Sequence, residues 1–352
     1  MSERYSRQIL LSEIGEGGQA KLTNSQVAVV GCGGLGAIAA SYLAGAGVGK
    51  IILVDGDSPS VSNLHRQVFY TGQESKFKSE VLHQRLQALN PEIEIHAAPQ
   101  YLNKENIDGL LTGVDLIMEC TDDIMTKYLV NDFAVLDQIP LVYGAIHKYE
   151  GYVSTFINRQ ESDLHLRDVF PYPDQTIPSC SEVGVLNTIA GLIGLLQANE
   201  ALKVILGIGE PLVGKLLTYD CLTNRQLVLQ MSKTWTQDME DLFDKSSYLA
   251  LDCSMVAEIN CEQLLDHRDS YTLVSVLSKQ EHHPIDEQTL HYQKMDTTQL
   301  STLPSDKPIV LYCKTGRVSK TIAAQLMEQK TKHQLLSLEG GLKAYRRHRP
   351  SE

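Results

Sequence analysis

The sequence predicts a doubly wound, mostly parallel α/β sheet with an antiparallel extension, followed by a smaller α/β domain. First, the apolar run at residues 27–30 leads into the turn Gly31-Cys-Gly-Gly-Leu-Gly36, and a helix of small residues follows. Second, the apolar run at 51–54 ends on Asp55, nineteen residues after the last glycine. Third, strand and helix patterns alternate up to about residue 145, as they do in parallel sheets covered on both faces.

The glycine turn is typical of Rossmann-like folds, in which each glycine has its own role. Gly31 permits the tight turn, Gly33 lets backbone N–H groups approach a phosphate, and Gly36 lets the helix lie close to the strand. The helix then directs its amino terminus at the anion, and Asp55 accepts hydrogen bonds from a ribose. The motif therefore predicts that the chain binds an adenine nucleotide, but it does not distinguish among NAD, FAD and ATP. A glycine-rich turn with a purely structural role is the alternative.

The other elements of the first domain follow from apolar runs and from the residues that end helices. Residues 1–22 predict an amphipathic lead-in helix that carries Arg4 and Arg7. Strands are predicted at 27–31, 51–55, 94–98, 116–120 and 141–144, with a helix at 79–89 that Asn90 and Pro91 end. A strand at 151–157, a loop at 158–182, a buried helix at 184–206 and a hairpin at 215–231 complete this domain.

A change of composition at residues 232–253 predicts a linker between domains at 1–231 and 254–352. Apolar runs in the second domain predict helices near 261–267 and 320–329 and strands at 272–276, 309–312 and 335–338. The loop after the strand at 309–312 begins with Cys313, and Gly340-Gly341 follows the last strand.

Composition excludes several classes of protein. The net charge of −12 argues against a general nucleic-acid binder. Seven scattered cysteines fit a reducing compartment better than a disulfide framework. The first residues lack the pattern of a signal peptide, and the longest uncharged run, at 183–199, is short for a membrane span. We therefore expect a soluble cytoplasmic protein with no nucleic-acid or membrane partner.

The polar residues that follow Asp55 do not suit hydride transfer. Asn63, Arg66 and Lys78 supply an amide and two cations, which suit a triphosphate. Asp122 follows the strand predicted at 116–120, where a carboxylate can hold Mg²⁺ together with phosphates. Each residue alone is a common solvated charge, turn residue or helix cap, but their ordered series favours adenylyl transfer.

This series resembles the MoeB/ThiF/HesA adenylyltransferases, which are relatives of the catalytic core of ubiquitin-activating enzymes. Over about residues 3–231 the matching motifs are RYSRQ at 4–8, GCGGLG at 31–36, DGD at 55–57, NLHRQ at 63–67, CTDD at 120–123 and SCSEVGVL at 179–186. Such enzymes use ATP to adenylate the C-terminal glycine of a ubiquitin-like sulfur-carrier protein, MoaD-like or ThiS-like and ending in Gly-Gly, and release pyrophosphate. The resemblance therefore implies ATP, Mg²⁺ and a carrier of this kind.

The resemblance also implies roles for individual residues. The nucleotide-binding set would be Gly31, Gly33, Gly34, Gly36, Asp55, Asp57, Asn63, Arg66, Lys78 and Asp122. Within it, Arg66, Lys78 and Asp122 would be catalytic through positioning and charge stabilisation, and Asp122 would bind Mg²⁺. Arg7 resembles the arginine that a neighbouring subunit supplies, which implies a homodimer. The sequence leaves open whether Lys76 shares the role of Lys78.

Two features of the loop region also follow from the resemblance. In the family, a cysteine at the position of Cys180 forms a thioester or persulfide with the carrier, and an inert loop thiol is the alternative. Many relatives hold a structural zinc ion with two Cys-x-x-Cys pairs. Here His165 and Asp168 occupy the positions of the first pair, and residues 232–242 contain no cysteine. We expect no structural zinc and another contact that holds loop and hairpin together.

The second domain resembles a rhodanese domain over about residues 254–349. The resemblance rests on the strand before Cys313, the loop with Gly316 and Arg317, and Gly340-Gly341. Fused relatives use such a cysteine persulfide, loaded by a donor such as a cysteine desulfurase, to deliver sulfur to the activated carrier. However, Arg317 stands one place early, and the acid and arginine expected after the strand at 272–276 are missing. Besides sulfur transfer through Cys313, a degenerate docking domain and a phosphatase-like loop stay open.

Two other classes of function remain as alternatives: a nucleotide-binding partner module without turnover, and an NAD- or FAD-linked oxidoreductase. If the protein is an adenylyltransferase, the sequence does not distinguish among carriers for molybdopterin biosynthesis, thiamine biosynthesis and tRNA thiolation. A small peptide substrate also stays open.

Overall fold

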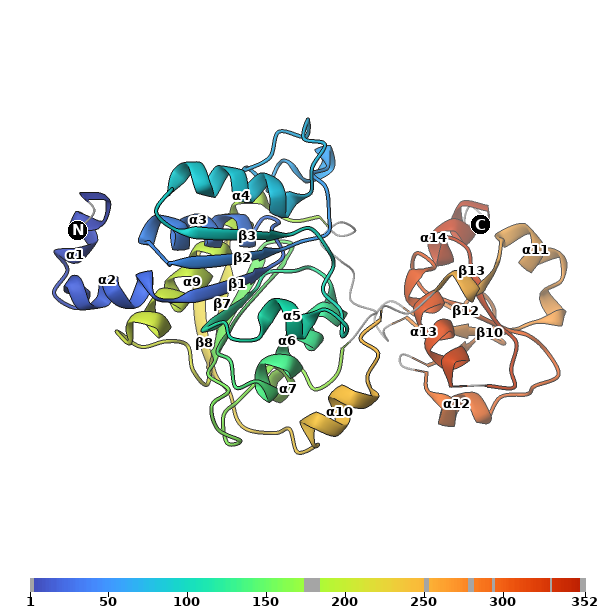
Figure 1. The fold of residues 1–352 in the computed structure, drawn as a ribbon. Helices are drawn as coiled ribbons and strands as arrows, with labels where there is room; N and C mark the ends of the chain where they lie inside the picture. Colours follow the sequence, from blue (N-terminus) through green and yellow to red (C-terminus); the bar gives the residue numbers. More distant parts are fainter. Residues whose placement is uncertain are drawn as a thin grey trace. The chain divides into compact units, whose positions relative to one another are not determined.

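In the computed structural model the chain divides into two compact units, the first ending at Tyr248 and the second beginning at Leu249. The structure describes residues 3–173, 184–249, 253–277, 282–292, 295–329 and 331–348. Figure 1 labels most elements of both units and colours the chain along the sequence.

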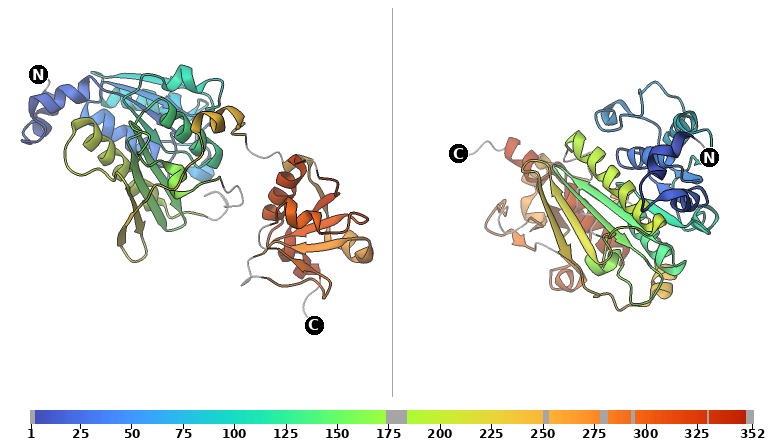
Figure 2. Two further views of the ribbon diagram at one scale, coloured as in Figure 1. Left: turned by 90° about the horizontal axis from the view of Figure 1, so that it is seen from below. Right: turned by 90° about the vertical axis from the view of Figure 1, so that its left-hand side faces the viewer.

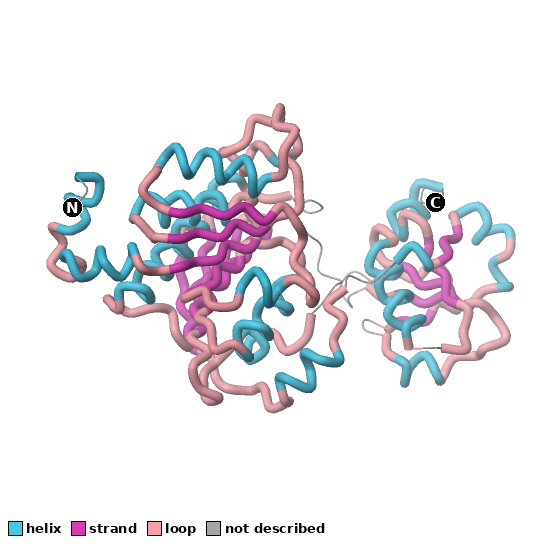
Figure 3. The backbone as a smooth tube through the Cα atoms, viewed as in Figure 1, coloured by secondary structure: helices cyan, strands magenta, loops and turns pink. Residues whose placement is uncertain are grey.

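The sheet of the first unit has eight strands in the order β3-β2-β1-β4-β5-β6-β7-β8. Neighbouring strands are parallel from β3 to β5 and antiparallel from β5 to β8. The strands are β1 (Gln26–Val30), β2 (Lys50–Val54), β3 (Glu94–Ala98), β4 (Leu116–Glu119), β5 (Leu141–His147), β6 (Glu150–Phe156), β7 (Lys215–Asp220) and β8 (Arg225–Gln230). The predicted parallel sheet with an antiparallel extension is therefore confirmed, and Figure 3 shows its strands in magenta.

Helices cover both faces of this sheet, as the views in Figures 1 and 2 show. One core forms under α3 (Gly36–Ala46), α4 (Lys78–Leu89) and α9 (Asn187–Leu206). The other forms under α5 (Ile107–Leu111), α6 (Ile124–Leu136) and the short α7 (Leu166–Val169). Burial on both faces explains why the parallel strands are near-continuous apolar runs in the sequence.

Helix α9 is, within the described residues, the one helix long and apolar enough to cross a membrane by length and composition. Half of its most apolar window is buried in the fold, and Ile189, Ala190 and Ile193 belong to the core of the first unit. Packing against α3 and the sheet therefore accounts for its apolar character, as the sequence predicts for a buried helix.

The lead-in segment differs from its prediction. Instead of one helix over residues 1–22, it forms α1 (Ser6–Ile9) and α2 (Gly15–Thr23), and Gly15, the first residue of α2, has a φ of +55°. A residue at positive φ interrupts a right-handed helix, and glycine accepts that conformation without strain. Gln8 donates to the carbonyl of Ala46 at 3.0 Å, and Asn90 donates to the Tyr5 hydroxyl at 2.8 Å. These bonds fasten α1 to the carboxyl ends of α3 and α4.

The segment predicted as a linker lies largely against the first unit. Helix α10 (Met239–Lys245) packs on α6, and the side chains of Trp235 and Tyr248 are buried. The first unit therefore extends beyond residue 231, to Tyr248. The sequence predicts a linker here because most of the segment is polar and only a few of its residues are buried.

The second unit has a five-stranded, all-parallel sheet in the order β11-β10-β12-β13-β9 around one apolar core. Its strands are β9 (Ala257–Ile259), β10 (Thr272–Ser275), β11 (Leu290–His291), β12 (Ile309–Tyr312) and β13 (Leu335–Leu338). Its helices are α11 (Cys261–Asp266), α12 (Thr297–Ser301), α13 (Arg317–Glu328) and α14 (Gly341–His348). Helix α13 begins three residues before its predicted start at 320, directly after Gly316 at a φ of +89°.

Candidate functional site

The first candidate site lies where β1, β2 and β4 end, and its centre is the glycine turn. A Cβ at Gly36 would lie 1.8 Å from the Gly31 carbonyl oxygen, so a side chain there has no room. Gly31 has a φ of +91°, and its Cβ would lie 2.9 Å from the backbone of Cys120. The turn therefore closes tightly over the end of β4 and starts α3 at once, which is the geometry that the motif predicts.

Two acids after β2 hold this turn and the start of α4. Asp55 accepts hydrogen bonds from the main-chain N–H groups of Cys32 at 2.7 Å and of Asp57 at 2.8 Å. Asp57 forms an ion pair with Lys78, whose Nζ lies 2.9 Å from Oδ2. The Lys78 side chain is only 5% exposed, so the acid and not water fixes the position of this cation. Burial raises the pKa of Asp55, and the attraction of Lys78 opposes that shift.

Arg66 and Gln67 complete the wall of the glycine turn. Asn63 starts this segment, and its carbonyl oxygen accepts from the main-chain N–H groups of Arg66 at 3.1 Å and of Gln67 at 3.0 Å. The Arg66 carbonyl would lie 3.2 Å from a Cβ at Gly34. Gln67 is buried beside Gly33, and no described group hydrogen-bonds to its Oε1. A buried polar atom without a described partner, next to two glycines that leave little room for a side chain, fits a site that a polar ligand completes.

The two candidate lysines have different environments in the structure. Lys76 is exposed, whereas Lys78 is buried and lies at the first position of α4. Only Lys78 contacts the acids that follow β2, through its ion pair with Asp57. The geometry therefore brings Lys78, and not Lys76, together with the glycine turn.

The acids after β4 also have different surroundings. Asp123 caps α6 by accepting from the main-chain N–H and the hydroxyl of Thr126, both at 2.7 Å. Asp122 is exposed and forms no hydrogen bond or ion pair with any residue that the structure describes. Because capping occupies Asp123, Asp122 is the carboxylate of this pair that is free to bind a ligand or a cation.

A buried ion pair supports the loop that carries Asp122. The fully buried Glu119 pairs with Lys127 of α6 and accepts from the main-chain N–H of Thr121 at 2.8 Å. Gln197 of α9 donates to the Glu119 carbonyl at 2.7 Å. Burial raises the pKa of Glu119, and the charge of Lys127 opposes that shift. Sequence reasoning missed this pair, although a lysine in the mainly apolar helix α6 was a usable signal.

One predicted residue, Arg7, is not brought to the glycine turn of its own chain. Arg7 is exposed on α1, which is fastened at the ends of α3 and α4 remote from the glycine turn. A helix of eleven residues, α3, separates those two ends of the fold. Cys180 lies outside the residues that the structure describes.

A polar cluster occupies the segments where the family resemblance led us to look for two Cys-x-x-Cys pairs. Arg167 donates twice to Asp132, at 2.7 and 2.6 Å, and both side chains are buried. Asp168 accepts from the main-chain N–H of Trp235 at 2.8 Å. His165 caps α7, and burial lowers its pKa to about 4. These bonds join residues 165–168 directly to the segment at 232–235. They are a contact of the kind expected between loop and hairpin in a chain without the zinc-binding cysteines. Within the described residues, no group of three or more His, Cys, Asp or Glu side chains could hold a metal ion.

The second candidate site is the loop after β12. Cys313 is buried, and its Sγ lies 3.5 Å from the hydroxyl of Ser319 in the first turn of α13. The Cys313 carbonyl accepts from the main-chain N–H of Leu342 at 2.9 Å. A Cβ at Gly341 would lie 2.4 Å from this carbonyl and 2.5 Å from the nitrogen of Gly316. The pair of glycines therefore lets the start of α14 close over the cysteine loop.

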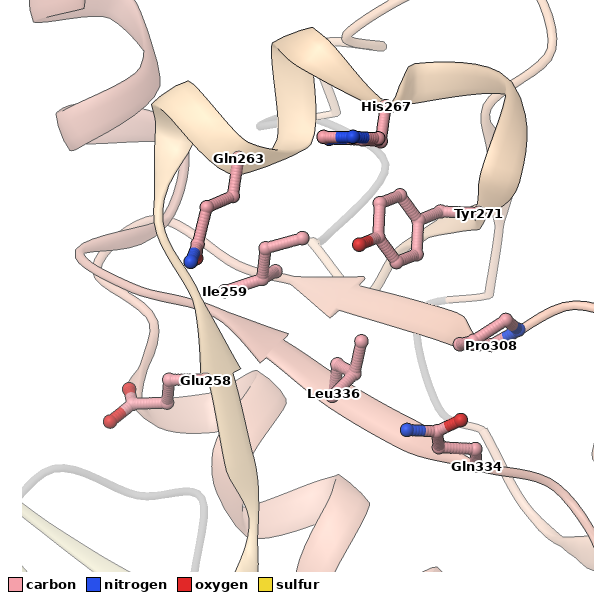
Figure 4. Close-up of a pocket in the computed structure, with 8 residues that line it drawn as sticks. All are labelled: Glu258, Ile259, Gln263, His267, Tyr271, Pro308, Gln334 and Leu336. Atoms are coloured by element: carbon pink, nitrogen blue, oxygen red, sulfur yellow. The ribbon is translucent and has the colours of Figure 1, made fainter.

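A pocket of about 440 Å³ in the second unit is separate from this loop (Figure 4). Its lining consists of Glu258, Ile259, Gln263, His267, Tyr271, Pro308, Gln334 and Leu336. Pro308 and Gln334 precede β12 and β13, whereas Cys313 follows β12. Because the strands are parallel, Pro308 and Gln334 lie at the end of the sheet opposite to Cys313, and Cys313 does not line the pocket.

These features are typical of a Rossmann-like nucleotide-binding enzyme joined to a domain in which a buried cysteine opens the loop after a central strand. The ThiF family matches residues 5–240, and the rhodanese-like domain matches residues 237–348. The chain therefore belongs to the ThiF family and carries a rhodanese-like domain after it.

Similar proteins agree with this assignment. The sulfur carrier protein adenylyltransferase of Thermus thermophilus is 45% identical over 229 residues, which cover 62% of this chain and 83% of that protein. The probable adenylyltransferase/sulfurtransferase MoeZ of Mycobacterium tuberculosis is 34% identical over 367 residues, covering 97% and 92%. The crystal structure of E. coli MccB with ATP shares the fold, with a TM-score of 0.59 and 21% identity over 68% of this chain and 74% of that one. The predicted resemblance and the predicted class, an adenylyltransferase, are confirmed.

Proposed function

We propose that the first unit uses ATP to adenylate the C-terminal glycine of a ubiquitin-like sulfur-carrier protein that ends in Gly-Gly. The observation that carries this proposal is the meeting of the glycine turn, Asp55, Arg66, Lys78 and Asp122 at one edge of the sheet. The name of the Thermus thermophilus relative supports a sulfur carrier as the substrate. ATP is the nucleotide that such a reaction consumes.

The site residues act by positioning and by stabilising charge. The carrier's terminal carboxylate is ionised at neutral pH, so it attacks the α-phosphorus without a general base, and the bond to pyrophosphate breaks. Arg66 and Lys78 oppose the negative charge that grows on the phosphates. Lys78 reaches them by exchanging the Asp57 carboxylate for a phosphate, since Asp57 is its partner in the free enzyme.

The chemistry of Asp122 fits a magnesium ion. It is an exposed carboxylate at the end of a parallel strand, and magnesium bound with phosphates takes only one or two protein carboxylates. When bound, the ion would neutralise phosphate charge, and Asp122 would hold it at the glycine turn. The Glu119–Lys127 pair keeps the loop of Asp122 in place.

For Arg7 we propose a role in the neighbouring subunit of a homodimer. Its exposed position on α1, away from the glycine turn of its own chain, supports this role. Mixing an Arg7→Ala variant with an Asp122→Ala variant should then restore part of the activity that each lacks alone. The reason is that a mixed dimer contains one site with both residues intact. Activity of the mixture no higher than that of its components would contradict a shared site.

The second unit is proposed to supply sulfur from a persulfide on Cys313, loaded by a donor such as a cysteine desulfurase. The outer sulfur attacks the carrier's acyl-adenylate and AMP leaves, which joins carrier and enzyme through an acyl disulfide. A second thiol then cleaves the S–S bond and releases the carrier thiocarboxylate. The name of the MoeZ relative, an adenylyltransferase/sulfurtransferase, supports this second step.

Carrier-dependent exchange between ATP and labelled pyrophosphate tests the proposed function. Each Gly-Gly-ending ubiquitin-like protein of the source genome is assayed beside a matched form that lacks the terminal glycine. We expect exchange with at least one full-length carrier and none with its shortened form, because the attacking carboxylate is then misplaced. Absence of exchange with every carrier, although ATP binds, would sink the proposal.

A further inference from the structure

Tyr101 is an exposed aromatic side chain that is nevertheless held firmly beside the nucleotide site. It follows β3 and is 68% exposed. Its hydroxyl donates to Oδ1 of Asp57 at 2.5 Å, and its carbonyl accepts from the side chain of Asn106 at 2.9 Å. The bond to Asp57 raises the pKa of Tyr101 to about 12, so the hydroxyl keeps its proton at neutral pH.

The backbone also fixes this ring. A Cβ at Gly56 would lie 2.7 Å from the Tyr101 nitrogen and 2.9 Å from its Cγ, so the ring rests against a loop that only glycine allows. An exposed side chain normally loses rotamer freedom when a ligand covers it. Here the hydroxyl and the backbone contact have already restricted the ring, so a flat ligand can cover its exposed part at a small entropic cost.

The order of the strands indicates which part of the nucleotide lies at this ring. Asp55 follows β2 and is placed to hold the ribose, while the phosphates extend toward the glycine turn after β1. The base is attached at the other side of the ribose and therefore extends toward β3, the outer neighbour of β2. Tyr101, three residues after the last residue of β3, is the first aromatic residue beyond that strand.

We infer that the ring of Tyr101 stacks on the adenine base of ATP and that its bond to Asp57 holds the ring in that position. The inference rests on the proposed function and adds a base-binding residue to it. It also makes Asp57 a shared partner, since its two carboxylate oxygens hold Tyr101 at the base end and Lys78 at the phosphate end.

Calorimetric titration of the full chain tests this inference with two probes, α,β-methylene-ATP and inorganic tripolyphosphate, which has no base. For Tyr101→Ala we expect affinity for the nucleotide analogue to fall roughly 10- to 100-fold, as for the loss of one base-stacking ring. Affinity for tripolyphosphate should stay unchanged. Tyr101→Phe keeps the ring and should lose at most about fivefold, the effect of one hydrogen bond. Tyr42→Ala, which removes another exposed tyrosine, serves as the matched control.

The outcomes distinguish failure of the stacking role of Tyr101 from failure of the proposed adenylyltransferase function. Wild-type affinity of Tyr101→Ala for the analogue would overturn the stacking role, and the proposed function would stand. An equal loss of affinity for both probes would also overturn it, because the residue then shapes the whole site. If the wild-type chain binds neither probe, the proposed function itself fails.

Discussion

The glycine turn after β1 and the cysteine loop after β12 have the same topology, since each joins a central parallel strand to the start of a helix. In the glycine turn the loop supplies only backbone, and the side chains proposed to act on the nucleotide, Asp55, Lys78 and Asp122, come from neighbouring segments. In the cysteine loop the sulfur proposed to react belongs to the loop itself. On the proposed function, one topology therefore serves as a platform for a bound substrate in the first unit and as a covalent carrier of sulfur in the second.

The two units also differ in how buried polar groups hold these loops. The first unit buries charged side chains, among them the pairs Glu119–Lys127 and Asp132–Arg167. In the part of the second unit that the structure describes, the buried polar side chains are hydroxyls only: Ser275, Ser319, Thr321 and Ser337. A buried charge that loses its partner costs far more than a lost hydroxyl contact, so the first unit should be the more sensitive to single substitutions.

The largest effect on the glycine-turn platform is expected for Asp122→Ala. We expect pyrophosphate exchange to fall about 10²- to 10³-fold, the usual loss when one preorganised charge-stabilising group is removed. Asp123→Asn is the matched control, because asparagine still caps α6 and exchange should stay near the wild-type rate. The opposite pattern in these two variants would assign the reactive role to Asp123.

An effect on stability, and not on the chemical step, is expected for Arg167→Met. This change leaves Asp132 buried without its cation, and it should destabilise the first unit by roughly 3–5 kcal/mol. Arg268→Met in the second unit removes a partly exposed pair with Asp286 and should cost about 1 kcal/mol or less. Calorimetric unfolding of the full chain measures the loss of stability in both variants. Equal losses would contradict the claim that the first unit is more sensitive to the removal of a charged partner.

The smallest effect is a pH dependence that arises from His165. Its pKa is about 4 in the folded chain because of burial, below its ordinary value of 6.5. The unfolded chain therefore binds the proton more readily, so this stability is complete above about pH 6.5 and is lost as the pH falls toward 4. The loss amounts to roughly 3 kcal/mol at most. His165→Asn can still cap α7 but cannot titrate in this range, and its stability should vary less over the same interval.

The sequence predicted the parts of the fold that local patterns specify. Apolar strands covered on both faces, and a glycine turn in which Gly31 and Gly36 have no room for side chains, leave clear signals in the chain. The break before Gly15 was not predicted, because residues 1–22 look amphipathic throughout and only the bonds of Gln8 and Tyr5 place α1. The extent of the first unit was also misplaced, since a polar segment conceals Trp235.

The candidate site shows the same limit. The family resemblance named the acids and cations, Asp122 among them, and the structure adds a physical reason for Asp122 over Asp123, because Asp123 caps α6. Tyr101 belongs to no motif, and its position depends on a contact with Gly56 across two strand ends. Residues that act through tertiary contacts therefore need the structure, whereas residues grouped in motifs do not.

The most direct test of the account is mass analysis of the carrier after incubation with ATP, a persulfide donor and the full chain. The account predicts a thiocarboxylate with the wild-type chain, an unchanged carrier with Asp122→Ala, and only the acyl-adenylate or its hydrolysis product with Cys313→Ser. Pyrophosphate exchange by Cys313→Ser should equal that of the wild-type chain. Thiocarboxylate formation by Cys313→Ser at the wild-type rate would contradict the division of the reaction between the two loops.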